Sequence, residues 1–221
     1  MEIWLDTWNL KAVQKAQQMG ILHGVTTNPS IAAKSGMALD DLLQMLLKVQ
    51  NGPVTAQVVA KKAEEMIQQG EALAKLSNRI FVKIPVTRDG LQAIYQLSQQ
   101  KIPVMATAVF DSTQALLAAR AGAQYIAPYF SHICEADQDG INELRMMIQL
   151  RDRYHYPSKI IAASLRSTEH VRECCSIGVD AVTMNEKLFD EYLEDHPMTI
   201  KAQERFDREW KTAAARKTLP F

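Results

Sequence analysis

The stretch Ile80-Phe81-Val82-Lys83-Ile84-Pro85-Val86 predicts a short β-strand, because it is an almost continuous run of apolar and β-branched residues. A helix start follows at Asp89-Gly90, so the strand and the next helix form one βα unit. The unit recurs along the chain, and the intervening segments, such as 39–49 and 63–76, carry apolar residues at helical spacing. The eight predicted strands are residues 3–7, 24–28, 54–59, 80–86, 103–110, 124–130, 159–164 and 181–185.

Eight βα units without a break in composition predict an α/β protein built as one closed (β/α)8 TIM barrel, which suits a chain of 221 residues. The alternative is an open doubly wound sheet. Such a sheet usually carries a glycine-rich loop after its first strand, where this chain has Thr7-Trp8-Asn9. We expect residues 1–197 to form the barrel and residues 198–221 an extra C-terminal helix, at 199–217, with a tail.

The ends of the predicted units give further expectations. Helix starts are expected at Asp111-Ser112 and at Ser167-Thr168-Glu169, where a short polar side chain can cap the helix. Residues 131–139 are polar and lie between a strand and a helix, so we expect a long loop there.

Composition excludes several classes of partner. The chain has 25 basic and 25 acidic residues, so nothing indicates electrostatic binding to nucleic acid or to an anionic membrane. No signal peptide and no apolar run of about 20 residues is visible. The three cysteines, Cys134, Cys174 and Cys175, lack metal-ligand spacing and are expected to be reduced thiols of a cytoplasmic protein. A net charge of zero is also compatible with self-association.

Lys83 is the exception within its predicted strand. The strands of a parallel barrel are buried on both faces and should be apolar throughout. Burying an unpaired ammonium costs several kcal/mol, so burial favours the neutral amine, which is a nucleophile. A lysine that reaches solvent, or one paired with a carboxylate, is an equally acceptable interpretation of the pattern alone.

Other polar residues lie at or near the carboxyl ends of predicted strands, where barrels place their active sites. They are Asp6, Thr26, Asn28, Gln57, Thr107, Tyr129 and Ser164. Helix capping would explain Asn28 and Ser164 individually. It does not explain Lys83, Gln57 and Thr107 inside apolar strands, so the set predicts a polar pocket around one amine.

Other kinds of site find less support. The five histidines include no close-spaced pair, and no glycine-rich nucleotide loop or serine nucleophile elbow is present, so we expect neither metal nor cofactor. Ser164-Leu165-Arg166-Ser167 follows the seventh strand, where barrels often bind phosphate. A solvated Arg166 beside an ordinary N-cap at Ser167 explains this segment at least as well.

Four segments resemble the transaldolase family, and in particular its small-subunit branch, which includes fructose-6-phosphate aldolase. They are Leu5-Asp6-Thr7, Gly24-Val25-Thr26-Thr27-Asn28-Pro29-Ser30, Val82-Lys83-Ile84-Pro85-Val86-Thr87 and Ala162-Ala163-Ser164. The resemblance covers essentially the whole chain. It implies an eight-fold barrel assembled as a pentamer or decamer, whose C-terminal helix contacts a neighbouring subunit.

The resemblance also implies roles for matching residues. Lys83 corresponds to the lysine that forms the Schiff base, and Asp6 to an aspartate that handles substrate hydroxyls and proton transfer. Thr26 and Asn28 match residues lining the donor site. Ser164 and Arg166 match residues that contact phosphate.

Two positions indicate an aldolase within the family. Transaldolases typically carry glutamate at the position of Gln57 and phenylalanine at that of Tyr129, whereas fructose-6-phosphate aldolases resemble this chain at both. In those aldolases the glutamine, the tyrosine and a threonine, here Thr107, hold the catalytic water. Unlike phenylalanine, a tyrosine hydroxyl can donate or accept a proton.

Two positions depart from the small-subunit branch. His132 stands where the branch usually has arginine, and an imidazole binds phosphate less well than a guanidinium. Asn185 replaces a proline that is frequent near the end of the eighth strand.

The resemblance therefore implies a Schiff-base aldolase that acts on the C3–C4 bond of fructose 6-phosphate and yields dihydroxyacetone and glyceraldehyde 3-phosphate. One alternative is a transaldolase with sedoheptulose 7-phosphate as donor. The other is a barrel that binds a sugar phosphate without turnover.

Overall fold

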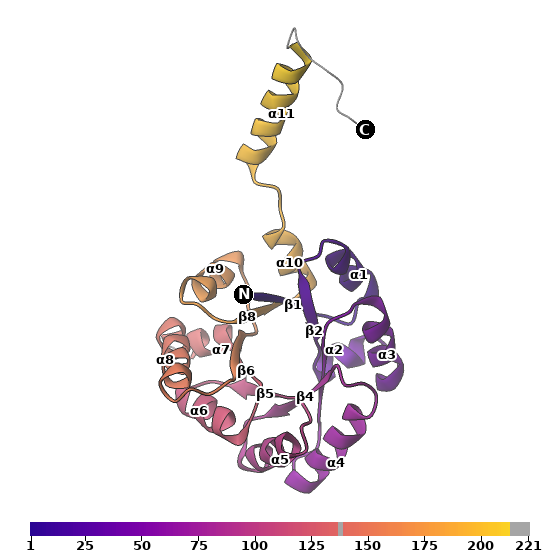
Figure 1. Cartoon of the computed structure of the whole chain (residues 1–221), viewed down its shortest axis with the longest axis vertical. Coiled ribbons are helices and arrows are strands. Elements are labelled where there is room, and N and C mark those ends of the chain that lie inside the picture. Colours follow the sequence, from indigo (N-terminus) through magenta and orange to yellow (C-terminus); the bar gives the residue numbers. More distant parts are fainter. Residues whose placement is uncertain (137–138, 213–221) are drawn as a thin grey trace.

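The computed structural model describes residues 1–136 and 139–212, and its centre is a closed barrel of eight parallel strands in chain order (Figure 1). All eight strands predicted from the sequence are present, so the predicted barrel is confirmed. Strands β1 and β2 have the predicted length but begin one and two residues earlier, and the other six are slightly shorter than predicted. The observed strands are β1 (Glu2–Asp6), β2 (Leu22–Thr26), β3 (Val54–Gln57), β4 (Ile80–Pro85), β5 (Val104–Val109), β6 (Tyr125–Pro128), β7 (Lys159–Ala162) and β8 (Ala181–Met184).

The helices form a layer around the strands (Figure 1). Each strand is followed by at least one helix, as the βα pattern predicts. Those in the described ranges are α1 (Leu10–Gln18), α2 (Pro29–Lys34), α3 (Leu39–Val49), α4 (Ala63–Ala74), α5 (Arg88–Gln99), α6 (Ser112–Ala121), α7 (Phe130–Glu135), α8 (Gly140–Arg153), α9 (Thr168–Ser176), α10 (Glu186–Tyr192) and α11 (Pro197–Thr212).

Capping side chains determine where several helices begin. Asp111 Oδ1 accepts a hydrogen bond from Gln114 N at 2.7 Å, and Ser167 Oγ accepts one from His170 N at 3.2 Å, so both predicted starts are confirmed. The start predicted at Asp89-Gly90 is slightly late. Helix α5 begins at Arg88, because the Thr87 hydroxyl caps it by accepting from Gly90 N at 2.9 Å.

The loop expected at residues 131–139 is wrong over most of its length, because α7 occupies Phe130–Glu135. Phe130 and Ile133 are three residues apart and both are buried, so this short helix has a buried apolar face. Ser131 Oγ lies 3.1 Å from His170 Nδ1 of α9, which adds a polar contact. Residues 137–138 lie outside the described part of the chain.

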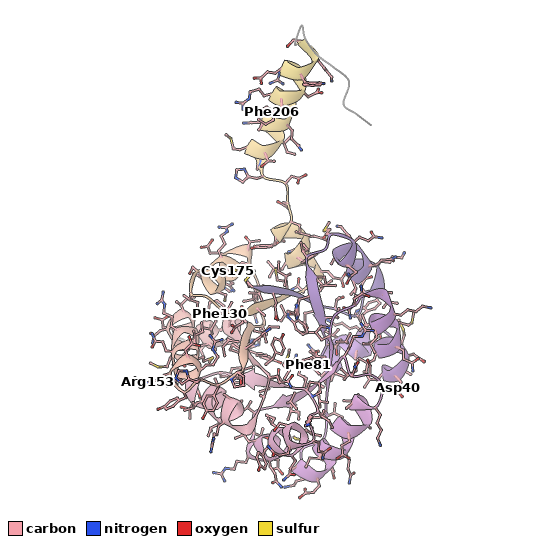
Figure 2. All side chains as sticks on the ribbon, in the orientation of Figure 1. Asp40, Phe81, Phe130, Arg153, Cys175 and Phe206 are labelled. Atoms are coloured by element: carbon pink, nitrogen blue, oxygen red, sulfur yellow. The ribbon has the colours of Figure 1, made fainter. Side chains whose placement is uncertain are left out.

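The barrel interior follows the two-residue alternation of its strands. Towards the amino ends of the strands it is filled by an apolar cluster that includes Trp4, Met105 and Tyr125, with Phe81 packed against it. Figure 2 shows side chains, among them the labelled Phe81, inside the ring of strands. The Tyr125 hydroxyl donates to Glu2 at 2.7 Å at this end. The inward positions farther along the same strands carry the polar residues of the candidate site, so the apolar cluster forms its floor.

The C-terminal helix α11 extends away from the barrel (Figure 1). It begins at Pro197, two residues before the predicted start, and residues 213–217 of the prediction lie outside the described part of the chain. No residue of Pro197–Thr212 is buried. Among the described helices, none is both long and apolar enough to cross a membrane. Cys134, Cys174 and Cys175 are free thiols, as expected.

Candidate active site

Lys83 points into the barrel and not into solvent. It lies on β4 and is only 4% exposed, and its amine donates a hydrogen bond to the carbonyl oxygen of Thr27 at 3.2 Å. Gln57 of β3 is its register partner. The Asp6 carboxylate acts electrostatically on the same amine. The amine is therefore buried next to polar groups at the carboxyl ends of β1 and β2, and the pocket expected around it stays a prediction.

Asp6 ends β1 within a chain of buried hydroxyls. The Thr26 hydroxyl donates to Asp6 Oδ1 at 2.6 Å and lies 2.7 Å from the Thr183 hydroxyl. Burial raises the pKa of Asp6, while the charge of Lys83 and the bond from Thr26 oppose this rise. Thr183 was not among the residues predicted for the site. Its signal was a threonine at an inward position of the otherwise apolar β8.

Gln57, Thr107 and Tyr129 belong to the same end of the barrel. The Thr107 hydroxyl donates to the Tyr129 hydroxyl at 3.3 Å. Gln57 Oε1 is buried and has no hydrogen-bond partner within the described residues. A buried carbonyl oxygen normally has a partner, so a water molecule or a substrate hydroxyl would satisfy this atom.

An irregularity in β5 places Thr107. The pairing of β5 with β6 shifts between Ala106 and Val109, and Ala108 has a φ of 53°. A bulge of this kind redirects the side chains next to it and is frequent beside active sites. No glycine stands in residues 104–109 that would have predicted this bulge from the sequence.

The rim after β7 brings Ser164 and Arg166 to α7. Ser164 has a φ of 59°, and its hydroxyl lies 2.9 Å from His132 Nδ1. The Arg166 guanidinium is about half exposed and forms an ion pair with Glu135 of α7. The interpretation of Arg166 as a solvated side chain is therefore correct only in part, while the N-cap at Ser167 is confirmed. Glu135 was not predicted as the partner of Arg166, because a loop and not a helix was expected at its position.

Aromatic rings line the same rim. The rings of Phe110 and Tyr129 meet edge to face with centroids 5.7 Å apart, and the His132 ring lies 5.6 Å from Tyr129. Phe110, which follows β5, is 40% exposed. It was not among the residues predicted for the site.

Asn28 and Asn185 both cap helices. Asn28 Oδ1 accepts from Ile31 N at 2.9 Å and Asn185 Oδ1 from Leu188 N at 2.9 Å. The capping interpretation of Asn28 is thus confirmed, and Asn185 caps α10. Both also line a cavity of about 430 Å³ beside Asp6. The described residues contain no group of three or more His, Cys, Asp or Glu side chains arranged to hold a metal ion.

Solved structures share the fold. The chain superposes on a mandelate oxidase mutant that carries a monooxide FMN adduct, with a TM-score of 0.57 at 13% identity. The match covers 80% of this chain and 59% of the oxidase chain. At this identity the likeness concerns the barrel alone.

Sequence relatives are much closer. Residues 3–219 match the family described as Transaldolase/Fructose-6-phosphate aldolase. The chain is 38% identical to "Probable transaldolase 1" of Listeria monocytogenes over 96% of this chain and 99% of the relative. It is 39% identical to "Probable transaldolase" of Caulobacter vibrioides over 95% and 96%. The chain belongs to the transaldolase/fructose-6-phosphate aldolase family and is an enzyme of the Schiff-base aldolase or transferase type.

Proposed function

We propose that this enzyme is an aldolase that cleaves and forms the C3–C4 bond of fructose 6-phosphate through an imine on Lys83. The observation that carries the proposal is the buried amine of Lys83 at the same barrel end as the Gln57, Thr107 and Tyr129 set. That set offers the unpartnered Gln57 oxygen and two hydroxyls, which are suitable groups for holding a water molecule. Because the chain belongs to a family of enzymes, we do not propose a barrel that binds a sugar phosphate without turnover.

Cleavage begins when the Lys83 amine attacks the C2 carbonyl of the ketose and water leaves, which forms a protonated imine. The imine withdraws electrons from the C3–C4 bond. Asp6 takes the proton of the C4 hydroxyl, the bond breaks, and the aldehyde departs. Burial raises the pKa of Asp6, which makes its carboxylate a stronger base than an exposed aspartate.

Release of dihydroxyacetone requires a proton and a water molecule. The enamine left on Lys83 takes a proton at C3, and water then adds to the imine carbon and frees the ketone and the amine. Water held by Gln57, Thr107 and Tyr129 would serve both events, and the Tyr129 hydroxyl can relay the proton. Thr26 and Asn28 would contact the donor part of the substrate. Ser164, His132 and Arg166 would face the departing aldehyde.

The second candidate is a transaldolase, in which an aldehyde instead of a proton captures the enamine. The relatives named probable transaldolases favour it, with sedoheptulose 7-phosphate as the donor. Both candidates share every step up to the enamine. They differ only in how the enamine leaves Lys83, so the residues around the proposed water decide between them.

We also propose that residues 1–197 are the catalytic domain and that α11 binds a second copy of the chain. Four of its apolar side chains recur every four residues and none of them is buried, so this helix face has no partner among the described residues. A net charge of zero gives no preference for a charged partner of another kind. The four recurring side chains are Met198, Ala202, Phe206 and Trp210, and Ile200 is a further exposed apolar side chain of this helix.

The fructose 6-phosphate assay separates the two candidates. We expect glyceraldehyde 3-phosphate to be released from fructose 6-phosphate without any added acceptor, because the water site can discharge the enamine. Release is followed by a coupled dehydrogenase, with and without erythrose 4-phosphate. Release that strictly requires erythrose 4-phosphate would make the enzyme a transaldolase.

Tyr129→Phe should lower the rate of dihydroxyacetone release by about 10²–10⁴, the usual contribution of a positioned proton donor or acceptor. Tyr125→Phe is the matched control. Tyr125 begins β6, the strand that Tyr129 follows, but its hydroxyl donates to Glu2 at the opposite end of the barrel, so its loss should leave this rate near the parent value. Equal rates in the two variants would remove Tyr129 from the mechanism.

The acid limb of the pH profile tests Asp6. Because its pKa is raised above the ordinary 3.8 and its charged form is the base, kcat/KM should fall as the pH drops through a value higher than 3.8. Asp6→Asn should abolish this limb and lower kcat/KM by about 10²–10⁴. Asp152→Asn, a change at an exposed aspartate of α8, is the control. An unchanged limb in Asp6→Asn would exclude Asp6 as the base.

The assembly is tested by the double variant Phe206→Glu and Trp210→Glu, compared with Arg208→Ala on the same helix. Sedimentation should show a pentamer or decamer for the parent and for the Arg208 control. The double variant should sediment as smaller species, because it places charges on the apolar face. A parent protein that sediments as a monomer refutes the proposal.

A further inference from the structure

We infer that the aldehyde end of the site gives phosphorylated aldehydes little advantage over uncharged ones, and that Glu135 and His132 are the cause. The inference rests on the proposed aldolase reaction and names the substrate class of the same site. It concerns the rim formed by Phe110, α7 and the segment after β7. There the groups able to bind a phosphate already have other partners.

Arg166 is the cation of this rim, and its charge is already compensated. Its guanidinium pairs with the carboxylate of Glu135, and both side chains are about half exposed. An incoming phosphate would have to displace the carboxylate or bind close to it. In either case the anion gains much less than it would from a free guanidinium, because the pair is neutral as a whole.

Ser164 and His132 are also engaged with each other. The Ser164 hydroxyl lies 2.9 Å from His132 Nδ1. When the hydroxyl donates to Nδ1, the ring carries its proton on Nε2 and can donate one hydrogen bond outward. A single neutral donor suits a hydroxyl or carbonyl oxygen. A phosphate dianion, with three strongly accepting oxygens, needs several donors and a positive charge.

The amino end of α9 offers an anion little help. Ser167 Oγ caps it by accepting from His170 N, so one of the backbone donors that could face a phosphate is already used. Glu169 places an acidic side chain in the first turn of the same helix, where it opposes a second negative charge. The amino end of α9 therefore disfavours phosphate binding, as the side chains of the rim do.

The remaining wall of the rim is aromatic. Phe110 stands edge to face against Tyr129, and the His132 ring lies at a tilt to that same ring. Phe110 is 40% exposed, so its ring is available to an incoming molecule. Ring surfaces favour the carbon chain of an aldehyde, whereas moving a phosphate from water against them is unfavourable.

The test measures kcat/KM for the addition of dihydroxyacetone to two aldehydes, glyceraldehyde 3-phosphate and glyceraldehyde, in the full-length enzyme. In the parent the ratio of phosphorylated to unphosphorylated substrate should stay below about ten. Glu135→Gln should raise the ratio at least about tenfold, because it frees Arg166 for a charge-assisted bond to phosphate. His132→Arg, which adds a guanidinium at the same place, should raise it as well.

Asp152→Asn is the matched control, since it also converts a carboxylate beside an arginine to an amide, but on Arg151 at the far end of α8. Its ratio should equal that of the parent. A parent ratio well above ten overturns the inference, as does a ratio that rises in neither Glu135→Gln nor His132→Arg. If the parent adds dihydroxyacetone to neither aldehyde, the proposed function fails and the inference falls with it. Addition with a strong preference for phosphate would overturn the inference alone.

Discussion

Closure of the barrel around the Lys83 amine is the constraint on which the rest of the site depends. A strand that pairs on both sides can direct a side chain only inward or outward, and β4 directs Lys83 inward, where it is almost fully buried. The amine is fixed by its hydrogen bond to the Thr27 carbonyl. A nucleophile held in this way needs little reorganisation before it attacks, which is the main advantage of a rigid scaffold.

The neighbours of this amine are arranged by the same alternation. Strands β1, β4, β5 and β8 each place an apolar side chain in the floor and a polar one above it. The polar side chains largely satisfy each other, as Asp6, Thr26 and Thr183 do. Within the part of the chain that the structure describes, the oxygen of Gln57 is the exception. Because an unsatisfied buried acceptor is costly, this exception indicates where a water molecule or substrate belongs.

Much of this could be predicted from the sequence, because the deciding signals are local. Apolar runs predicted the strands, and polar residues inside those runs, Lys83 above all, predicted the site. The pairing of Arg166 with Glu135 could not be predicted, since it joins two segments 31 residues apart through a helix that polar composition disguised as a loop. The bulge beside Thr107 could not be predicted from the sequence either, because a β-bulge depends on the pairing with the next strand.

The most direct test of the central claim is covalent trapping of the imine. The enzyme is incubated with dihydroxyacetone and borohydride, digested, and its peptides are weighed by mass spectrometry. The account predicts a reduced adduct on the peptide that contains Lys83 and none in Lys83→Ala. An adduct on a different lysine, or no adduct in the parent enzyme, would contradict the assignment of Lys83 as the nucleophile.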